Sequence, residues 1–480
     1  MRLRPTALVV LLLALLLAAP PAPAKKKPPS QWLVLTNVTV VDVRDGSNQP
    51  GMTVVIRNDR ITAIAKRALI QIDRNVQVVN ATGQYLIPGL WDMHVHLVPA
   101  DGGKWARPVV LPLLVANGVT GVRDMGGDWK ALSQLKKEVQ SGALPGPRIV
   151  TPGPFVDGRA HPGEPVVAAA SAEEARAAVR SLKAEGVDFI KVQSLLPRDA
   201  FLALADEARR QRIPFVGHVP LAVNAAEASD AGMASMEHLL GILLSCSRRE
   251  EEIRRTELET IAQRDTVANV RAQFEEMATF DPGRASVLFA KLAANHTWQT
   301  PTLVFLRARA RADEPFIHAD PRLQYLPGKI RGHYDSKEIP PGFTPDDLQK
   351  YKQLYERKAA LVAPMRRAGV EFLAGSDDEP LTVPGFSLHD ELELLVSAGL
   401  TRLEALQAAT LNPAKFLGKE RDLGTVEPGK VADLVLLDAD PMEDIRNTRK
   451  IRGVVLNGRF LDRAALDKLL AEARAAKKTP

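Results

Sequence analysis

The sequence predicts an α/β fold, a (β/α)8 TIM-like barrel with a small β-sandwich domain formed from both chain ends. Three observations support it. Short apolar strands alternate with helical stretches through the middle of the chain, β-rich segments lie near both termini, and 480 residues are enough for a large barrel with one smaller unit.

Residues 1–24 have the layout of a cleavable export signal. Arg2 and Arg4 precede an apolar run over 7–19, and small residues follow it up to Ala24. An uncleaved membrane anchor is the alternative, but about 20 apolar residues are needed to span a bilayer and this run is shorter. We therefore expect a cut near Ala24, no stable membrane insertion after cleavage, and a periplasmic or secreted protein.

The formal net charge of +6 is concentrated at the chain ends, where lysines cluster at 25–27 and 477–478. The body between them is close to neutral and has no basic patch of the kind that binds nucleic acid, so we expect no nucleic-acid partner. Cys246 is the only cysteine, so no internal disulfide can form. Stability must then come from packing and metal. The sequence leaves homo-oligomer formation open.

The two chain ends predict one small, discontinuous β-sandwich domain over 31–88 and 419–463. β-branched runs separated by polar turn residues are typical of hairpin-connected strands. Residues 464–480 are expected to form a basic C-terminal helix or tail. The runs that predict strands are 33–42, 53–56, 430–437 and 451–458.

Residues 89–418 carry the barrel pattern, with helices expected at 171–185 and 198–212. The active site of such a barrel lies at the carboxyl ends of its strands. The eight strands are expected to end near His96, Asp124, Pro152, Val192, His218, His238, Leu303 and Ser376.

A helical or lid insertion is expected over about 245–356, where the connections are too long for simple loops. The charged run 248–273 predicts helix. The stretch 311–351 is rich in Pro and Gly and predicts a loop or lid over the barrel mouth.

Candidate metal ligands begin with His94 and His96, at the end of the first strand. Alternation along a strand puts both side chains on the same face, so both can reach one metal. Two histidines on a strand are often structural, and the pair alone is weak evidence. Its position after the Ile87-Pro88-Gly89 turn strengthens the metal-binding interpretation.

Lys191 lies inside the apolar strand 187–192. Such a lysine usually extends its ammonium to a surface. Here the neighbouring strand ends carry histidines, and burial would lower the pKa of the amine. A neutral amine can add carbon dioxide to give a carbamate, an anion able to bridge two metals.

His218, His238 and Asp377 each follow a predicted strand. A histidine in this position is more often structural, and Asp377 alone would be a good helix cap. Both histidines at successive strand ends argue for a second metal position. Six residues of ligand type at five strand ends are hard to explain as separate structural accidents.

These motifs resemble those of the amidohydrolase superfamily. The resemblance rests on Pro88–His96, Lys191, the two later histidines and Gly375-Ser376-Asp377, and it extends to Pro384–Leu392, Asn412–Lys415 and Gly424–Asp433. The short gap between His218 and His238 is similar to the imidazolonepropionase-related branch, which includes prolidase-like (Xaa-Pro and Xaa-Arg type) dipeptidases that contain a carbamate. Hydantoinases and dihydroorotases place these histidines further apart. The insertion departs from the family pattern.

The resemblance implies a centre of two divalent metal ions, with zinc the expected metal. One ion would be held by His94, His96 and Asp377 and the other by His218 and His238, with Lys191 as a bridging carbamate (N6-carboxylysine). A metal-bridging hydroxide would attack the substrate. Asp377 would act as the catalytic acid–base group that moves the proton to the leaving amine.

The implied function is a binuclear metal-dependent hydrolase of amide or peptide C–N bonds, acting on a small-molecule amide such as a dipeptide or an N-acyl amino acid. A mononuclear cyclic amidine or imide hydrolase or deaminase is an alternative that would not need Lys191. Phosphotriester or lactone hydrolysis could use the same centre. A third class, a non-catalytic binding protein, is disfavoured because the whole ligand set is present.

The remaining candidates are weaker. Arg159 and His161 follow the third strand and could bind a substrate carboxylate, although an ordinary exposed loop is the simpler interpretation. Asp124 either orients a ligand histidine or caps a helix. His389 and Glu391 are assigned to the start of a helix rather than to the site.

Overall fold

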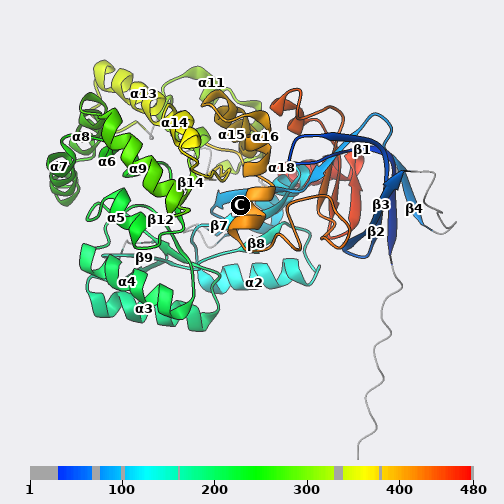
Figure 1. The fold of residues 1–480 in the computed structure, drawn as a ribbon, viewed down its shortest axis with the longest axis horizontal. Coiled ribbons are helices and arrows are strands. Elements are labelled where there is room, and N and C mark those ends of the chain that lie inside the picture. Colours follow the sequence, from blue (N-terminus) through cyan, green and yellow to red (C-terminus); the bar gives the residue numbers. More distant parts are fainter. Residues whose placement is uncertain are drawn as a thin grey trace, which may run out of the picture.

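The computed structural model describes residues 31–66, 76–98, 103–160, 163–328, 339–377 and 381–476. A β-rich part, drawn in blue and red, lies beside a larger α/β part (Figure 1). This arrangement confirms the α/β fold with a β-rich unit. The expected signal peptide and His161 lie outside the described residues. Within them, every helix is too short or too polar to cross a bilayer.

The β-rich part is one sheet of eight strands in the order β17-β16-β15-β5-β1-β2-β3, with β4 beside β1. β5 pairs with β1 on one side and with β15 on the other, which joins the two ends of the chain. The edge strand β3 also contacts the segment just before β15, where Arg60 pairs with Val431. The sheet must curl to bring these two parts together. The expected two-sheet sandwich is therefore a single curled sheet around one apolar cluster. Its strands are β1 (Trp32–Val41), β2 (Asn48–Arg57), β3 (Arg60–Lys66), β4 (Gln77–Asn80), β5 (Tyr85–Pro88), β15 (Leu434–Leu437), β16 (Ile451–Leu456) and β17 (Arg459–Asp462).

The α/β part contains two parallel sheets, β6-β7-β8 and β10-β9-β11-β12-β13-β14. Most of these strands have only three residues and are buried throughout, as expected where helices cover a parallel sheet. β9 and β10 were not predicted. The strands are β6 (Leu90–Val95), β7 (Val119–Asp124), β8 (Arg148–Val150), β9 (Phe155–Asp157), β10 (Val166–Ala168), β11 (Ile190–Val192), β12 (Phe215–Gly217), β13 (Ser235–Glu237) and β14 (Trp298–Thr300).

The eighth predicted strand is reduced to a single bridge, between Phe372 and Gln299 of β14. Beyond it, the Met93 amide of β6 donates to the Ala374 carbonyl at 2.8 Å, so residues 372–374 lie between β14 and β6. The expected barrel thus takes the form of two sheets with a linking segment rather than one closed sheet. The linking segment also lies close to β6: a Cβ on Gly375 would lie 2.7 Å from the Cβ of His94, so a larger residue would not fit there.

Helices pack around these sheets, with α2, α3 and α4 on one side of the α/β part and α7, α9, α13 and α14 on the other (Figure 1). α3 begins at a capping box formed by Ser171 and Glu174, and its buried face carries Ala175, Val179 and Leu182. The first helices are η2 (Ala106–Val110), α1 (Leu111–Ala116), α2 (Trp129–Gln140), α3 (Ala172–Glu185), α4 (Arg198–Gln211), α5 (Ala225–Asp230) and α6 (Ile242–Ser245).

The predicted insertion is mostly helical, and β14 lies inside it. Its charged run forms two helices, because the Asp265 side chain caps the second one. In the described part of the expected 311–351 loop, α11, η3 and the start of α13 are helical. The later helices are α7 (Glu250–Ala262), α8 (Thr266–Ala278), α9 (Pro282–Ala294), α10 (Leu303–Ala310), α11 (Pro315–His318), η3 (Pro321–Tyr325), α13 (Pro345–Ala359), α14 (Val362–Arg367), α15 (Phe386–Ser397), α16 (Arg402–Ala408), α17 (Leu411–Phe416), η4 (Ile445–Arg449) and α18 (Arg463–Ala476).

Candidate metal centre

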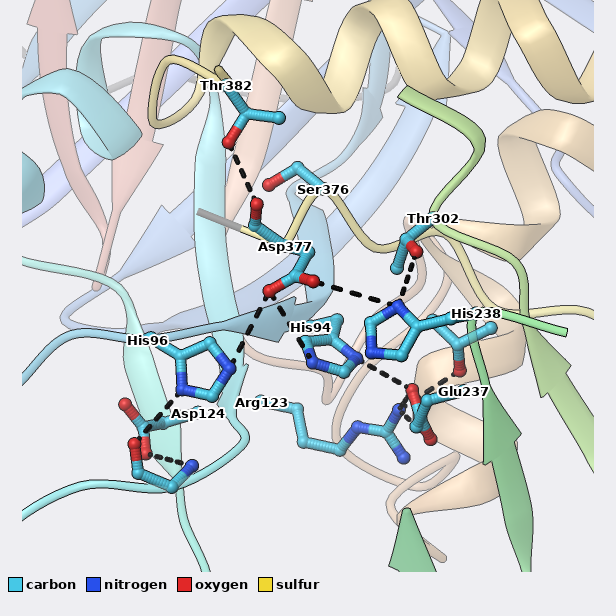
Figure 2. Close-up of polar contacts among 12 residues, drawn as sticks. His94, His96, Arg123, Asp124, Glu237, His238, Thr302, Ser376, Asp377 and Thr382 are labelled. Carbon is cyan, nitrogen blue, oxygen red and sulfur yellow. Dashed lines mark hydrogen bonds and ion pairs between the residues drawn. The ribbon is translucent and has the colours of Figure 1, made fainter. Parts of the chain in front are cut away.

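The six candidate ligands line one cavity of about 600 Å³. Each lies on or just after a parallel strand or the linking segment, where the carboxyl ends of the strands meet. Figure 2 shows His94, His96 and His238 gathered around Asp377. The lining ligands are His94, His96, Lys191, His218, His238 and Asp377.

Three of these residues form a compact cluster. One ligand atom from each of His94, His96 and Asp377 lies within 4.8 Å of the other two. The Asp377 Oδ1 atom is 3.7 Å from Nε2 of His94 and 3.6 Å from Nε2 of His96. The same carboxylate reaches the second group, since its Oδ2 is 3.7 Å from Nδ1 of His238. Histidine nitrogens and a carboxylate at this spacing suit a transition metal such as zinc.

All four histidines use Nδ1 for a hydrogen bond within the protein. The partners are Glu237 for His94 (2.9 Å), the Gly126 carbonyl for His96 (3.1 Å), Ser194 for His218 (2.8 Å) and Thr302 for His238 (2.7 Å). A bond at Nδ1 fixes the ring and leaves Nε2 for a metal, which is the usual arrangement of metal-binding histidines. Asp377 faces Nε2 of His94 and His96, whereas at His238 it faces Nδ1. The four rings therefore fit a metal centre.

Burial keeps three of the rings neutral. It lowers the pKa of His94, His218 and His238 well below 6.5, and neighbouring Lys191 lowers all three further. Only a neutral imidazole has a lone pair for a metal, so these rings are ready to bind one at neutral pH.

Lys191 lies beside the histidines and is almost fully buried. Burial lowers the pKa of its amine to about 8, while Glu237 and Asp377 oppose the change. Gly217 on the neighbouring strand makes room for it. A Cβ at position 217 would lie 2.9 Å from Cδ of Lys191, and the glycine also has a φ of +131°.

Three residues in the turns around the candidate ligands have strained backbones. His238, Thr302 and Asp377 adopt positive φ angles of 61°, 48° and 52°, a region that non-glycine residues seldom enter. Such strain persists only where the surroundings hold it, and it clusters at functional sites. Asp92 supplies part of that support by accepting hydrogen bonds from the amide and hydroxyl of Ser376 at 2.9 and 2.6 Å.

The sequence interpretation missed a buried ion pair beneath the cluster. Arg123 and Glu237 are fully buried and bonded at 2.9 Å, and Glu237 also holds His94 (Figure 2). Arg123 further donates to Ser235, Thr300 and the Met93 carbonyl. The available signal was a charged residue inside each of two predicted strands of the barrel, because such residues are seldom buried without a partner.

The structure does not bring Arg159 to the cavity wall. It follows β9, is exposed and is absent from the described cavity lining. Asp124 accepts hydrogen bonds from the amides of Leu97 and Gly126, so it supports the backbone that holds His96.

His389 and Glu391 are buried within α15, away from the ligands. His389 bonds Thr448 and the Asn117 carbonyl, and Glu391 accepts from the Val304 amide.

The family model that matches this chain is the amidohydrolase family, over residues 85–461. The chain belongs to the amidohydrolase family. Its match to the imidazolonepropionase of Maricaulis maris is 37% identical over 111 residues and covers 22% of this chain and 28% of that one. The alignment thus spans little more than a quarter of that relative. Ochratoxinase from Aspergillus niger is 24% identical over 418 residues, which cover 75% of this amidohydrolase and 72% of the relative.

Solved structures share the fold over most of the chain. Bottromycin amidohydrolase matches with a TM-score of 0.73 and 24% identity, over 94% of this amidohydrolase and 92% of that chain. A candidate prolidase from Bifidobacterium longum matches with a TM-score of 0.65 and 25% identity. The match covers 92% of this amidohydrolase and 99% of that chain. Together with the imidazolonepropionase match, the prolidase fold confirms the branch predicted from the sequence.

Proposed function

We propose that this amidohydrolase is a metal-dependent hydrolase of C–N bonds in dipeptides or N-acyl amino acids. The observation that carries the proposal is the buried set of four histidines, Lys191 and Asp377 that faces one cavity. Similarity to a candidate prolidase and to ochratoxinase supports amide hydrolysis. We also infer that residues 89–418 form a distorted (β/α)8 barrel, with 31–88 and 419–463 as the second domain. Its eight parallel positions would be β6, β7, β8 together with β9, β11, β12, β13, β14 and residues 372–374.

The residues fit a pair of divalent ions, with zinc the expected metal. His94, His96 and Asp377 would hold one ion, and His218 and His238 the other, with Lys191 between them. When bound, such ions supply Lewis acidity that activates water and polarises the scissile carbonyl.

Lys191 would contribute as a carbamate. Its lowered pKa leaves part of the amine neutral at neutral pH, so the nitrogen lone pair can bond to the carbon of carbon dioxide. The amine proton then leaves to water, and the product carries one negative charge. That charge replaces a buried ammonium that would repel two cations.

Asp377 would move the proton that the reaction requires. Its carboxylate spans both groups of histidines, with one oxygen toward His94 and His96 and the other toward His238. It is therefore placed to take a proton from the attacking water and deliver it to the departing amine, which leaves poorly unless protonated.

Zinc-loaded protein should hydrolyse members of a dipeptide and N-acyl amino acid library, and it should contain close to two metal ions per chain after preparation with bicarbonate.

Lys191→Ala should lose most activity and metal, because the bridging anion is gone. Release of free amino acid and elemental analysis are the two measurements.

Short carboxylic acids should partly restore the Lys191→Ala variant, since a carboxylate can take the place of the carbamate. A fully active wild type with one metal per chain would contradict the binuclear proposal. No hydrolysis of any library member would contradict the proposed substrate class.

Two observations favour the mononuclear alternative. His94, His96 and Asp377 alone satisfy the spacing of a single site, and a relative 47% identical over 74 residues is an adenine deaminase of Rhizobium meliloti. A mononuclear enzyme would not need the buried Lys191 beside the histidines. We therefore place this alternative second.

We further propose that the protein is exported. The mature chain should begin near Lys25 and occur in a periplasmic or culture fraction, because the basic, apolar and small-residue segments of 1–24 match a cleaved signal. Mass spectrometry of the protein isolated from that fraction identifies the first residue of the mature chain. An intact Met1 in the membrane pellet would contradict export.

A further inference from the structure

Three helices of the insertion build a wall of the cavity that the strand ends do not supply. α13 packs against both α8 and α10, and side chains from all three helices face the cavity. Most of these side chains are apolar or aromatic, which suits an apolar portion of a substrate. They include Val270, Phe305, Leu306, Tyr351, Leu354 and Tyr355.

Lys358 is a cation in this wall. Its side chain lines the cavity although the residue is only 6% exposed. Among the described residues, no carboxylate oxygen lies within 4.0 Å of its ammonium, and it makes no hydrogen bond. A buried ammonium that is not paired is unfavourable, so a site of this kind is completed by an anion.

Two buried acids satisfy Lys358 only in part. Glu257 and Glu276 are both buried and interact with it electrostatically from α7 and α8. Burial raises the pKa of both carboxyls, and the charge of Glu257 raises that of Glu276 further. The two acids therefore favour sharing a proton, and their combined negative charge is reduced.

Arg309 on α10 adds a second cation to the same wall. Its guanidinium carbon lies 5.4 Å from the centre of the Phe305 ring, and that ring lies 5.6 Å from the ring of His238. The Phe305 ring therefore lies between His238 and Arg309, in a cavity that Lys358 also lines. A ligand that fits this order has a reactive amide, then an apolar side chain, then an anionic group.

We propose that Lys358, with Arg309 on the neighbouring helix, binds the carboxylate of the substrate while the wall between them and His238 receives a hydrophobic side chain. The inference rests on the proposed function and narrows it. The substrates become dipeptides or N-acyl amino acids that end in a free carboxylate next to an aromatic or large aliphatic side chain. The insertion thus supplies the specificity and the strand ends supply the chemistry.

Binding of 3-phenylpropanoate to the zinc-loaded enzyme tests the site without turnover. Titration calorimetry should show binding that weakens roughly 10- to 100-fold in Lys358→Met, as expected for a lost charge-assisted contact. Lys358→Arg keeps the cation and should retain most of the affinity. Lys350→Met is the matched control, because it removes an exposed lysine paired with Asp346 on the same helix. It should bind like the wild type.

Equal affinity in the wild type and Lys358→Met overturns the proposal, as does a wild type that does not bind 3-phenylpropanoate. If Lys358→Met fails to fold, as judged by its melting temperature, Arg309→Met replaces it with the same expectation. In the wild type, 3-phenylpropanamide should bind more weakly than the acid, and equal affinity also overturns the site.

Hydrolysis separates this inference from the proposed function. With alanyl-phenylalanine and its C-terminal amide, the wild type should prefer the free acid, and Lys358→Met should lose that preference mainly through KM. If the wild type and Lys358→Met each hydrolyse the free acid and the amide with the same kcat/KM, amide hydrolysis is supported and the carboxylate site is overturned. Lys358-dependent binding of 3-phenylpropanoate without hydrolysis of any amide supports the site and overturns the proposed function.

Discussion

Asp377→Asn should lower turnover by about 100-fold to 10,000-fold while most of the bound metal is kept, the range typical of a lost general acid–base group. Asparagine preserves the shape and one oxygen ligand but has no basic site. In the structure this carboxylate lies between both groups of histidines, so the variant removes the basic group that the two groups share. Turnover of the best library substrate, metal content and melting temperature are the measurements.

Asp128→Asn provides the matched control. Asp128 caps α2 by accepting a hydrogen bond from the Ala131 amide at 2.8 Å, and Asn caps a helix about as well as Asp. Turnover and stability of this variant should stay close to the wild type. If Asp377→Asn behaved in the same way, Asp377 would have only a structural role and the proposed acid–base scheme would fall.

Arg123→Met should destabilise the fold by about 3–5 kcal/mol, the usual loss when one partner of a buried ion pair is removed. Methionine fills similar space but leaves Glu237 buried without its cation. It also removes the donor that connects β6, β7, β13 and β14 through Met93, Ser235 and Thr300. Urea unfolding of metal-free protein, followed by circular dichroism, measures the loss without a contribution from bound metal.

Arg180→Met makes the same substitution at an arginine that is 51% exposed and 3.7 Å from Glu207. Its effect should stay within about 0.5 kcal/mol, as at most surface positions. Adding Glu237→Gln to Arg123→Met should recover part of the stability, because the buried negative charge is gone. Equal losses for Arg123→Met and Arg180→Met would show that the buried pair does not hold the strands together.

The metal-binding candidates were accessible from sequence because their signal is local. Alternation placed His94 and His96 on one face, and the strand-end rule drew attention to Lys191, His218 and His238 without any knowledge of contacts. The Arg123–Glu237 pair joins residues far apart in the chain. The sequence showed each charge inside a predicted strand but not that the two strands bring the charges together.

The parts that the sequence missed depend on packing between distant segments. Gly375 lies close to His94 and the eighth strand is a single bridge, and no residue propensity reports either feature. The same holds for the cavity wall. Residues 311–351 have the composition of a loop, yet α13 begins within them at Pro345 and carries Lys358 to the cavity.

The position of β5 between β1 and β15 also sets the order in which the molecule can be completed. β15 emerges from the ribosome among the last strands, and until then β5 has an open edge. Asp377 is also made late, so a partly synthesised chain can assemble neither the terminal sheet nor the full ligand set. Pairings between such distant segments form slowly, because a long loop must be closed first. For a chain proposed to leave the cell, this topology delays folding until the precursor is nearly complete, which helps to keep it in a form that can be translocated.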